Sequence, residues 1–133
     1  MTDSTRWWRL ALLGGVVILA FDIAASSTSR ATGISYDRFA YGSFLIQVAA
    51  GFIARRAGFP VGRSTVLGTW VAAIEATLGW AVSWWIGPGR PTESLTVDGL
   101  AGVALFVIVT GTALGALGAW IGGQGRSSMA GEV

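Results

Sequence analysis

The sequence contains no cysteine, no histidine and no lysine, and these absences exclude several kinds of chemistry. Without cysteine there are no disulfides or thiol nucleophiles, and without histidine the remaining common ligands of zinc and haem are missing as well. Any proton relay would have to use carboxylates. No nucleophile motif, phosphate-binding loop or metal-ligand spacing appears in the sequence. We therefore expect no enzymatic activity, no cofactor and no metal site.

Charge is scarce as well. Only 12% of the 133 residues are charged, 53% are hydrophobic and the mean hydropathy is +0.62. This composition is too apolar for an ordinary soluble domain. The basic residues are all arginines and lie at the ends of apolar runs, so we expect membrane lipid and not nucleic acid as the partner. The composition predicts an all-α polytopic membrane protein.

Four apolar runs have lengths suited to membrane-spanning helices. A helix needs roughly 20 residues to cross a hydrocarbon core about 30 Å thick. We expect spans at about residues 7–26, 36–54, 64–86 and 99–122, with a polar loop at 27–35. The basic start of the first run could also indicate a cleavable signal peptide, but three further runs follow it. The favoured interpretation is a single domain, 1–133, that forms a four-transmembrane-helix bundle.

The arginines are divided unequally between the two sides of such a bundle. Six fall on the side of the termini and three on the opposite side: Arg6, Arg9, Arg55, Arg56, Arg63 and Arg126, against Arg30, Arg38 and Arg90. Positively charged loops tend to remain in the cytoplasm. The sequence therefore predicts that both termini are cytoplasmic.

The third apolar run carries a carboxylate, Glu75, near its middle. At 100° per residue, Glu75 shares a helix face with small residues, and the opposite face is broad and rich in tryptophan. The small residues are Gly68, Ala72, Gly79 and Ser83. Because small side chains allow neighbouring helices to approach closely in lipid, we expect Glu75 to point into the bundle.

Two further polar side chains, Gln47 and Asp22, also lie on faces made mostly of small residues. These are Ala40, Ser43, Ala50, Gly51 and Ala54 beside Gln47, and Ala11, Gly15, Ile18, Ala25 and Ser26 beside Asp22. From the rise per residue, Glu75 lies roughly 16 Å and Gln47 roughly 11 Å from the cytoplasmic ends of their helices. We expect these two side chains to form a polar layer with a threonine of the fourth run, Thr110 or Thr112.

Asp22 is expected closer to the outer boundary, roughly 8 Å below it. At this depth it is near the level of Tyr41 and within snorkelling reach of Arg38. The sequence therefore predicts a second polar contact, from Asp22 to one of these two residues, with a structural role favoured over a functional one.

The fourth run contains a regular stripe of glycines. Gly111, Gly115, Gly118 and Gly122 recur at steps of four, three and four residues, and we call them the glycine stripe. Two overlaid G-x-x-x-G spacings allow a second helix to approach very closely. Packing within the chain is favoured, and an interface in a homo-oligomer or a larger membrane complex is the alternative.

Glu75 has two interpretations. It can be a protonated carboxyl that hydrogen-bonds to Gln47 or a threonine and only supports packing. The chain is then a non-enzymatic accessory, scaffold or packing subunit. Alternatively, Glu75 binds a proton or cation, because an ionisable group inside the membrane is a functional candidate. The chain is then a small proton- or cation-coupled transporter that acts as an oligomer. The first is favoured, because no second midplane charge completes a relay.

The run Ala50–Gly58 (AGFIARRAG), followed by the third span and a glycine-rich fourth, resembles the layout of small uncharacterised four-span bacterial membrane proteins. The resemblance covers about residues 40–122 and implies a location in the bacterial plasma membrane, without implying an activity. Chain size and a single membrane glutamate also resemble the small multidrug-resistance transporters. In that family the glutamate lies in the first helix, where this chain has Asp22, which argues against membership.

Overall fold

The described chain is almost entirely helical. The computed structural model describes residues 2–90 and 96–127, and no strand occurs among them. The elements are α1 (Asp3–Thr32), the 3-10 segment η1 (Tyr36–Phe39), α2 (Ala40–Arg56), α3 (Val61–Ile74), the π-helical segment η2 (Glu75–Gly79), α4 (Trp80–Ile86) and α5 (Val97–Ser127). Because α3, η2 and α4 follow one another without a break, residues 61–86 form one long helix. The prediction of an all-α fold is confirmed.

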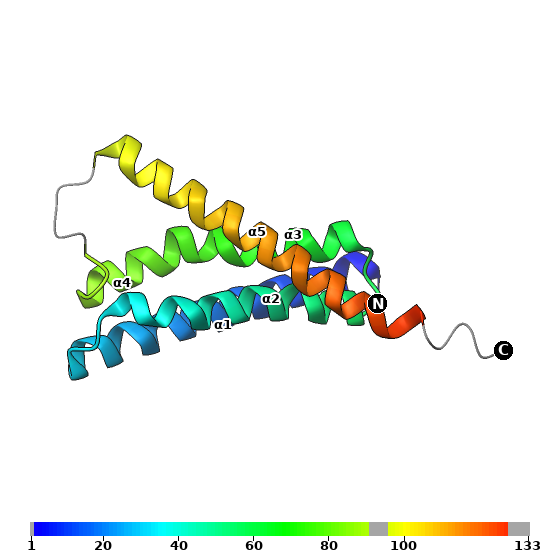
Figure 1. Cartoon of the computed structure of the whole chain (residues 1–133), viewed down its shortest axis with the longest axis horizontal. Helices are drawn as coiled ribbons and strands as arrows, with labels where there is room; N and C mark the ends of the chain where they lie inside the picture. The colour runs from blue at the N-terminus through cyan, green and yellow to red at the C-terminus, as the bar shows by residue number, and fades with distance from the viewer. Residues whose placement is uncertain (1, 91–95, 128–133) are drawn as a thin grey trace.

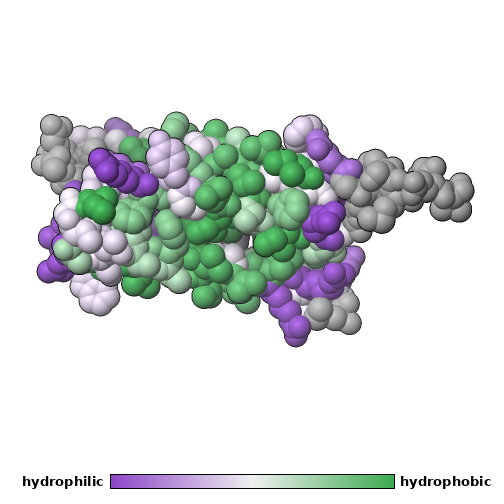
Figure 2. Space-filling view, turned by 60° about the horizontal axis from the view of Figure 1, so that its bottom comes forward, coloured by the Kyte–Doolittle hydropathy of each residue, from purple (hydrophilic) through white to green (hydrophobic). Residues whose placement is uncertain are grey.

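The helices lie side by side as an elongated bundle (Figure 1). Three are long and apolar enough to cross a membrane: Asp3–Thr32, Val61–Ile86 and Val97–Gln124. The fourth rod, made of η1 and α2, runs alongside them. On the face shown in Figure 2, hydrophobic residues form a band across the middle of the bundle, and hydrophilic residues are gathered toward its two ends. This distribution suits a protein whose middle lies in hydrocarbon.

The two ends of the bundle hold different connections. We call the end with residue 2 and the α2–α3 connection the inner end, and the end with Gly33 and Gly87 the outer end. At the inner end Arg6 Nη2 donates to the carbonyl of Ala57 at 3.0 Å. At the outer end Arg30 Nη1 donates to the carbonyl of Ile86 at 2.9 Å. The described chain begins and ends at the inner end (Figure 1).

The polar stretch 27–35, predicted as a loop, is helical as far as Thr32. Its hydroxyl groups satisfy backbone carbonyls, because Thr32 Oγ1 donates to the carbonyl of Thr28 and Ser29 Oγ donates to the carbonyl of Ile34, both at 2.7 Å. The helix ends at Gly33, whose φ of 73° is readily adopted only by glycine. The prediction was wrong because serine and threonine are tolerated in a helix that extends beyond the apolar core.

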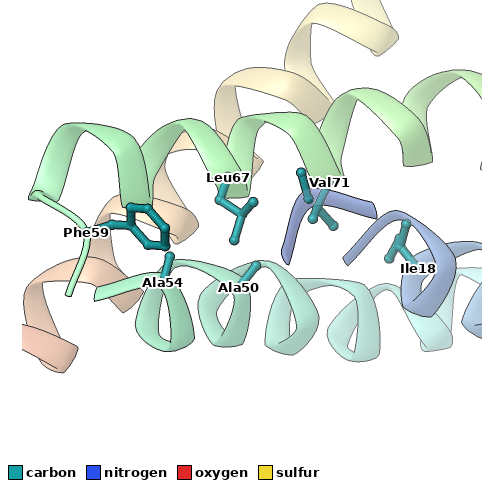
Figure 3. Packing of buried hydrophobic residues seen from close by; sticks show 7 residues of the cluster. Ile18, Ala50, Ala54, Phe59, Leu67 and Val71 are labelled. Atoms are coloured by element: carbon teal, nitrogen blue, oxygen red, sulfur yellow. The ribbon is translucent and has the colours of Figure 1, made fainter. Parts of the chain in front are cut away.

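The apolar core lies in the inner half of the bundle, between α1, α2 and α3. Its largest side chains are Ile18, Leu67, Val71 and Phe59, with alanines of α2 between them (Figure 3). The small faces predicted for α1 and α2 are buried, with the exception of Ala40: Ala11, Gly15, Ile18, Ala25 and Ser26 on α1, and Ser43, Ala50, Gly51 and Ala54 on α2. Small residues therefore bring these backbones together, as expected for helix packing in lipid.

Helix α5 packs on one side of this core and then leaves it. It contacts α2, α3 and η2, and within the described residues it has no contact with α1 or α4. All four members of the glycine stripe are buried, whereas no residue between Val97 and Thr110 is. Figure 1 shows the first half of α5, in yellow, diverging from α4 toward the outer end. The bundle is therefore tightly packed at its inner end and opened by α5 at its outer end.

Candidate functional site

The centre of the site is a hydrogen bond between two long helices. Gln47 Nε2 on α2 donates to Glu75 Oε2 at 2.6 Å. Gln47 is 1% exposed, and Glu75 is half-buried. The structure thus brings together two of the three polar residues singled out in the sequence.

The glycine stripe positions the Gln47 amide. A Cβ added at Gly111 would overlap Ala72 and would lie 3.1 Å from both Cδ and Oε1 of Gln47. The absence of a side chain at Gly111 therefore lets the amide lie flat against α5 with its NH₂ group directed to Glu75. The Oε1 atom is buried and has no hydrogen-bond partner within the described part of the chain. Packing fixes this side chain more than polar contacts do.

Glu75 begins the π-helical segment η2. The hydroxyl of Thr77 donates to the carbonyl of Ala73 at 2.7 Å, which competes with the backbone bond that an α-helix would make there. Such side-chain bonds bend helices and loosen the regular backbone ladder. Short π-helical insertions are rare and occur frequently at functional sites. The irregular turn therefore coincides with the one carboxylate of this helix.

A pocket of about 240 Å³ opens beside Glu75, where α5 diverges from α2 and α4. Six of its lining residues are polar, namely Glu75, Asp37, Gln47, Ser43, Thr110 and Tyr36, and the remaining wall is aromatic and aliphatic: Phe21, Phe39, Ala40, Phe44, Trp80, Val103, Phe106 and Val107. Thr110 thus reaches the predicted polar layer, whereas Thr112 does not, because its hydroxyl pairs with that of Thr69 at 2.9 Å. The pocket combines two carboxylate residues, Glu75 and Asp37, with largely apolar walls.

No positive side chain neutralises Glu75. Among the residues that the structure describes, the one ion pair within 4.0 Å joins Arg6 to Asp3 near the inner end. The pocket wall contains no arginine. A carboxylate in such surroundings attracts a cation or holds a proton, because an uncompensated charge in a low-dielectric region is costly.

The third predicted site residue, Asp22, lies in a buried polar cluster next to Glu75. Asp22 is 1% exposed, and its Oδ1 accepts a hydrogen bond from the Tyr36 hydroxyl at 3.2 Å. The predicted partners were wrong: Tyr41 is 74% exposed, and Arg38 makes no ion pair among the described contacts. The reason is that the Asp22 side chain is buried inside the bundle, where Tyr36 of η1 is close enough to bond to it.

Gly79 allows the two carboxyl groups to approach each other. A Cβ added at this position would overlap Asp22 Oδ2 and would lie 3.7 Å from Glu75 Cγ. Asp22 and Glu75 therefore flank the same glycine from two helices, close enough for their negative charges to oppose each other. The sequence indicated small residues on this face, but it did not indicate that both acids would meet there.

The sequence placed Ser26 on the face of Asp22 and Ser83 on the face of Glu75, but it did not indicate that these serines and Tyr36 would form one cluster. Ser26 and Ser83 are fully buried and lie beside the Tyr36 hydroxyl, and their oxygens have no hydrogen-bond partner of good geometry within the described residues. Ser26 and Asp22 are four residues apart on one helix, a spacing that marks a shared face. This spacing was the available signal for Ser26; nothing comparable marked Tyr36.

Within residues 2–90 and 96–127, no group of three or more acidic side chains could hold a metal ion. The sequence matches no known protein family, and no curated protein or solved structure shows significant similarity to it.

Proposed function

We propose that this chain is a small bacterial plasma-membrane protein that crosses the bilayer four times with both termini in the cytoplasm, and that it binds and exchanges small organic cations at Glu75. The fourth crossing rests on η1 and α2. The 17 residues of α2 rise about 26 Å and the four of η1 about 8 Å, together slightly more than a hydrocarbon core of about 30 Å. The bacterial location rests on the resemblance described above.

The observation that supports cation binding is the position of Glu75 in the pocket wall. The carboxylate is held by Gln47, faces a space of about 240 Å³ and has no arginine beside it. A glutamate with a purely structural role would be expected to have packing and hydrogen-bonding partners on all sides. Glu75 instead faces an open pocket, which leaves its charge uncompensated. A bound cation provides the missing charge.

The chemistry of the walls indicates the class of ligand. Trp80 and Phe21 offer aromatic surfaces, and aromatic rings attract organic cations. The volume is somewhat below the range of roughly 300–1,000 Å³ typical for drug-sized ligands. The expected occupant is therefore a small alkyl- or arylammonium ion that reaches the site between α2 and α5.

Binding of benzyltrimethylammonium to the purified protein in detergent micelles tests the proposal. We expect Glu75→Gln to weaken binding about 30-fold, because losing one member of a partly buried charge pair costs about 2 kcal/mol. The matched control is Asp3→Asn, which removes a carboxylate at the exposed inner end. Equal affinity of the Glu75→Gln variant and the parent would refute the proposal.

Transport is tested separately in liposomes. Uptake of labelled benzyltrimethylammonium should be saturable for the parent and reduced to the background of empty liposomes for Glu75→Gln. Because glutamine keeps the size and hydrogen-bonding ability of glutamate, the variant should fold like the parent. Binding without uptake would restrict the function to a binding subunit.

A second function, that of an accessory or scaffold subunit, is supported by a different observation. The first half of α5 leaves its large side chains uncovered, including Leu105 and Phe106, which are 63% and 68% exposed. Lipid or another membrane helix can cover such a surface. Crosslinking in membranes distinguishes the two: a scaffold subunit gives a specific heteromeric product, whereas a self-contained carrier gives none or a homo-oligomer.

A further inference from the structure

The buried cluster around Asp22 has hydrogen-bonding groups that are incompletely paired. Asp22 Oδ2, Ser26 Oγ and Ser83 Oγ are all buried without a hydrogen-bond partner within the described residues. Most buried polar atoms in proteins are hydrogen-bonded, so such exceptions need a physical cause. The three atoms belong to α1 and α4. The two serines lie beside the Tyr36 hydroxyl, which donates to the other oxygen of Asp22.

A proton on Oδ2 fits the surroundings of that atom. An ionised carboxylate only accepts hydrogen bonds, and Oδ2 has no donor, whereas a protonated carboxyl donates from one oxygen and accepts at the other. Oδ1 already accepts from Tyr36. A proton on Oδ2 removes the negative charge that an ionised carboxylate would hold there without a donor, and neither serine hydroxyl makes a hydrogen bond to Oδ2 that could compensate such a charge.

The neighbouring charges favour the same assignment. Two groups that ionise face Asp22, Tyr36 from η1 and Glu75 from η2. The other ionisable side chains on the elements packed against α1 lie away from the cluster. Asp37 and Arg38 of η1 and Tyr41 of α2 are exposed, the arginines of α2 and α3 lie at the inner end, and α4 has none. Two carboxylates flanking Gly79 cannot both be charged without strong repulsion.

The two carboxyl groups differ in their surroundings, and this difference divides their roles. Glu75 accepts a hydrogen bond from the Gln47 amide and lines the pocket, and both features lower the cost of its charged form. Asp22 is sealed, with a single donor from Tyr36. In the empty protein the negative charge therefore belongs on Glu75 and the proton on Asp22.

Building on the cation-binding function proposed above, we infer that Asp22 is the coupling proton site, which holds a proton on Oδ2 while the pocket is empty and releases it when a cation occupies Glu75. The bound cation compensates the charge of Glu75, so that Asp22 can ionise without repulsion. One singly charged cation enters and one proton leaves, which keeps the net charge of the site constant. Tyr36 contacts Asp22 and lines the pocket, and it therefore connects the two.

Infrared spectroscopy of the empty protein tests the proton directly and does not depend on cation binding. The parent should show a carboxylic-acid C=O band that is absent from Asp22→Asn and still present in Glu75→Gln. In Glu75→Gln the band should disappear at lower pH than in the parent, because a neighbouring negative charge has been removed. Should Asp22→Asn fail to fold, Tyr36→Phe serves instead, because losing the donor to Oδ1 should make the band persist to higher pH. A parent without the band, or a band that these variants do not change, overturns the assignment.

Calorimetry of benzyltrimethylammonium binding in buffers of different ionisation enthalpy tests the coupling. The parent should release about one proton per cation bound, and its affinity should increase with pH. Asp22→Asn should release none, and its affinity should not change with pH. Release of a full proton by this variant overturns the coupling. If the parent does not bind the cation at all, the proposed function and the coupling fail together, while the infrared result still decides whether Asp22 carries a proton.

Discussion

Replacement of Gly118 by alanine tests how closely α5 approaches its neighbours. A Cβ added to Gly118 would overlap the carbonyl oxygen of Val48 and would lie 2.8 Å from its carbonyl carbon and 2.9 Å from the amide nitrogen of Phe52. All three atoms belong to the backbone of α2, so no side-chain rotation can relieve the contact. Restoring an ordinary contact of about 3.5–4.0 Å with the Val48 carbonyl oxygen would require the helices to separate by about 1.5 Å.

The expected cost is obtained by comparison with a second glycine of the same helix. A Cβ at Gly102 would meet no atom within 4 Å. Both substitutions gain the same helix propensity, up to about 1 kcal/mol, and this gain cancels in their difference. The remaining term is overpacking, typically 1–3 kcal/mol. We therefore expect Gly118→Ala to be less stable than Gly102→Ala by about 1–3 kcal/mol.

The assay is reversible unfolding in mixed detergent micelles, followed by tryptophan fluorescence, with free energies of unfolding obtained for the parent and both variants. Trp120, two residues from the substitution, provides a local signal. If the two variants differ by less than about 0.5 kcal/mol, the close contact between α2 and the glycine stripe is wrong, and with it the support that the stripe gives to Gln47.

Three further predictions concern the polar contact, the topology and the core. Gln47→Leu removes the donor to Glu75 Oε2; we expect a loss of about 1–3 kcal/mol in the free energy of unfolding, and no loss would mean that this contact contributes nothing. Since the chain has no cysteine, Thr28→Cys and Gly62→Cys can be labelled with a membrane-impermeant thiol reagent; labelling from opposite faces supports a membrane-crossing α2, and labelling from the same face contradicts it. Phe59 is 4% exposed in the inner core, and we expect Phe59→Ala to lower the free energy of unfolding by about 3–5 kcal/mol. A loss below about 1 kcal/mol would show that this end is loosely packed.

The proposed roles of the two acids invert the ranking that the sequence favoured. Glu75 was expected as a protonated packing group, because no second charge was apparent near it. In the structure Asp22 flanks the same glycine, so the two acids can divide charge and proton between them. The rise per residue placed Asp22 closer to the outer boundary of the membrane than Glu75. It gave no information on how far apart the two side chains lie in the plane of the membrane. Two helices that face each other can bring side chains of different depth into contact.

The sequence by itself determined the helical content, the small faces of the helices and the level of Gln47 and Glu75. These follow from composition and from a fixed rotation and rise per residue, which are local properties. Only the tertiary structure decided that Asp22 contacts Tyr36, that η2 is π-helical and that α5 diverges to open a pocket beside Glu75. These features depend on how one backbone lies against another, and helix periodicity specifies which face is buried without specifying the neighbour that buries it.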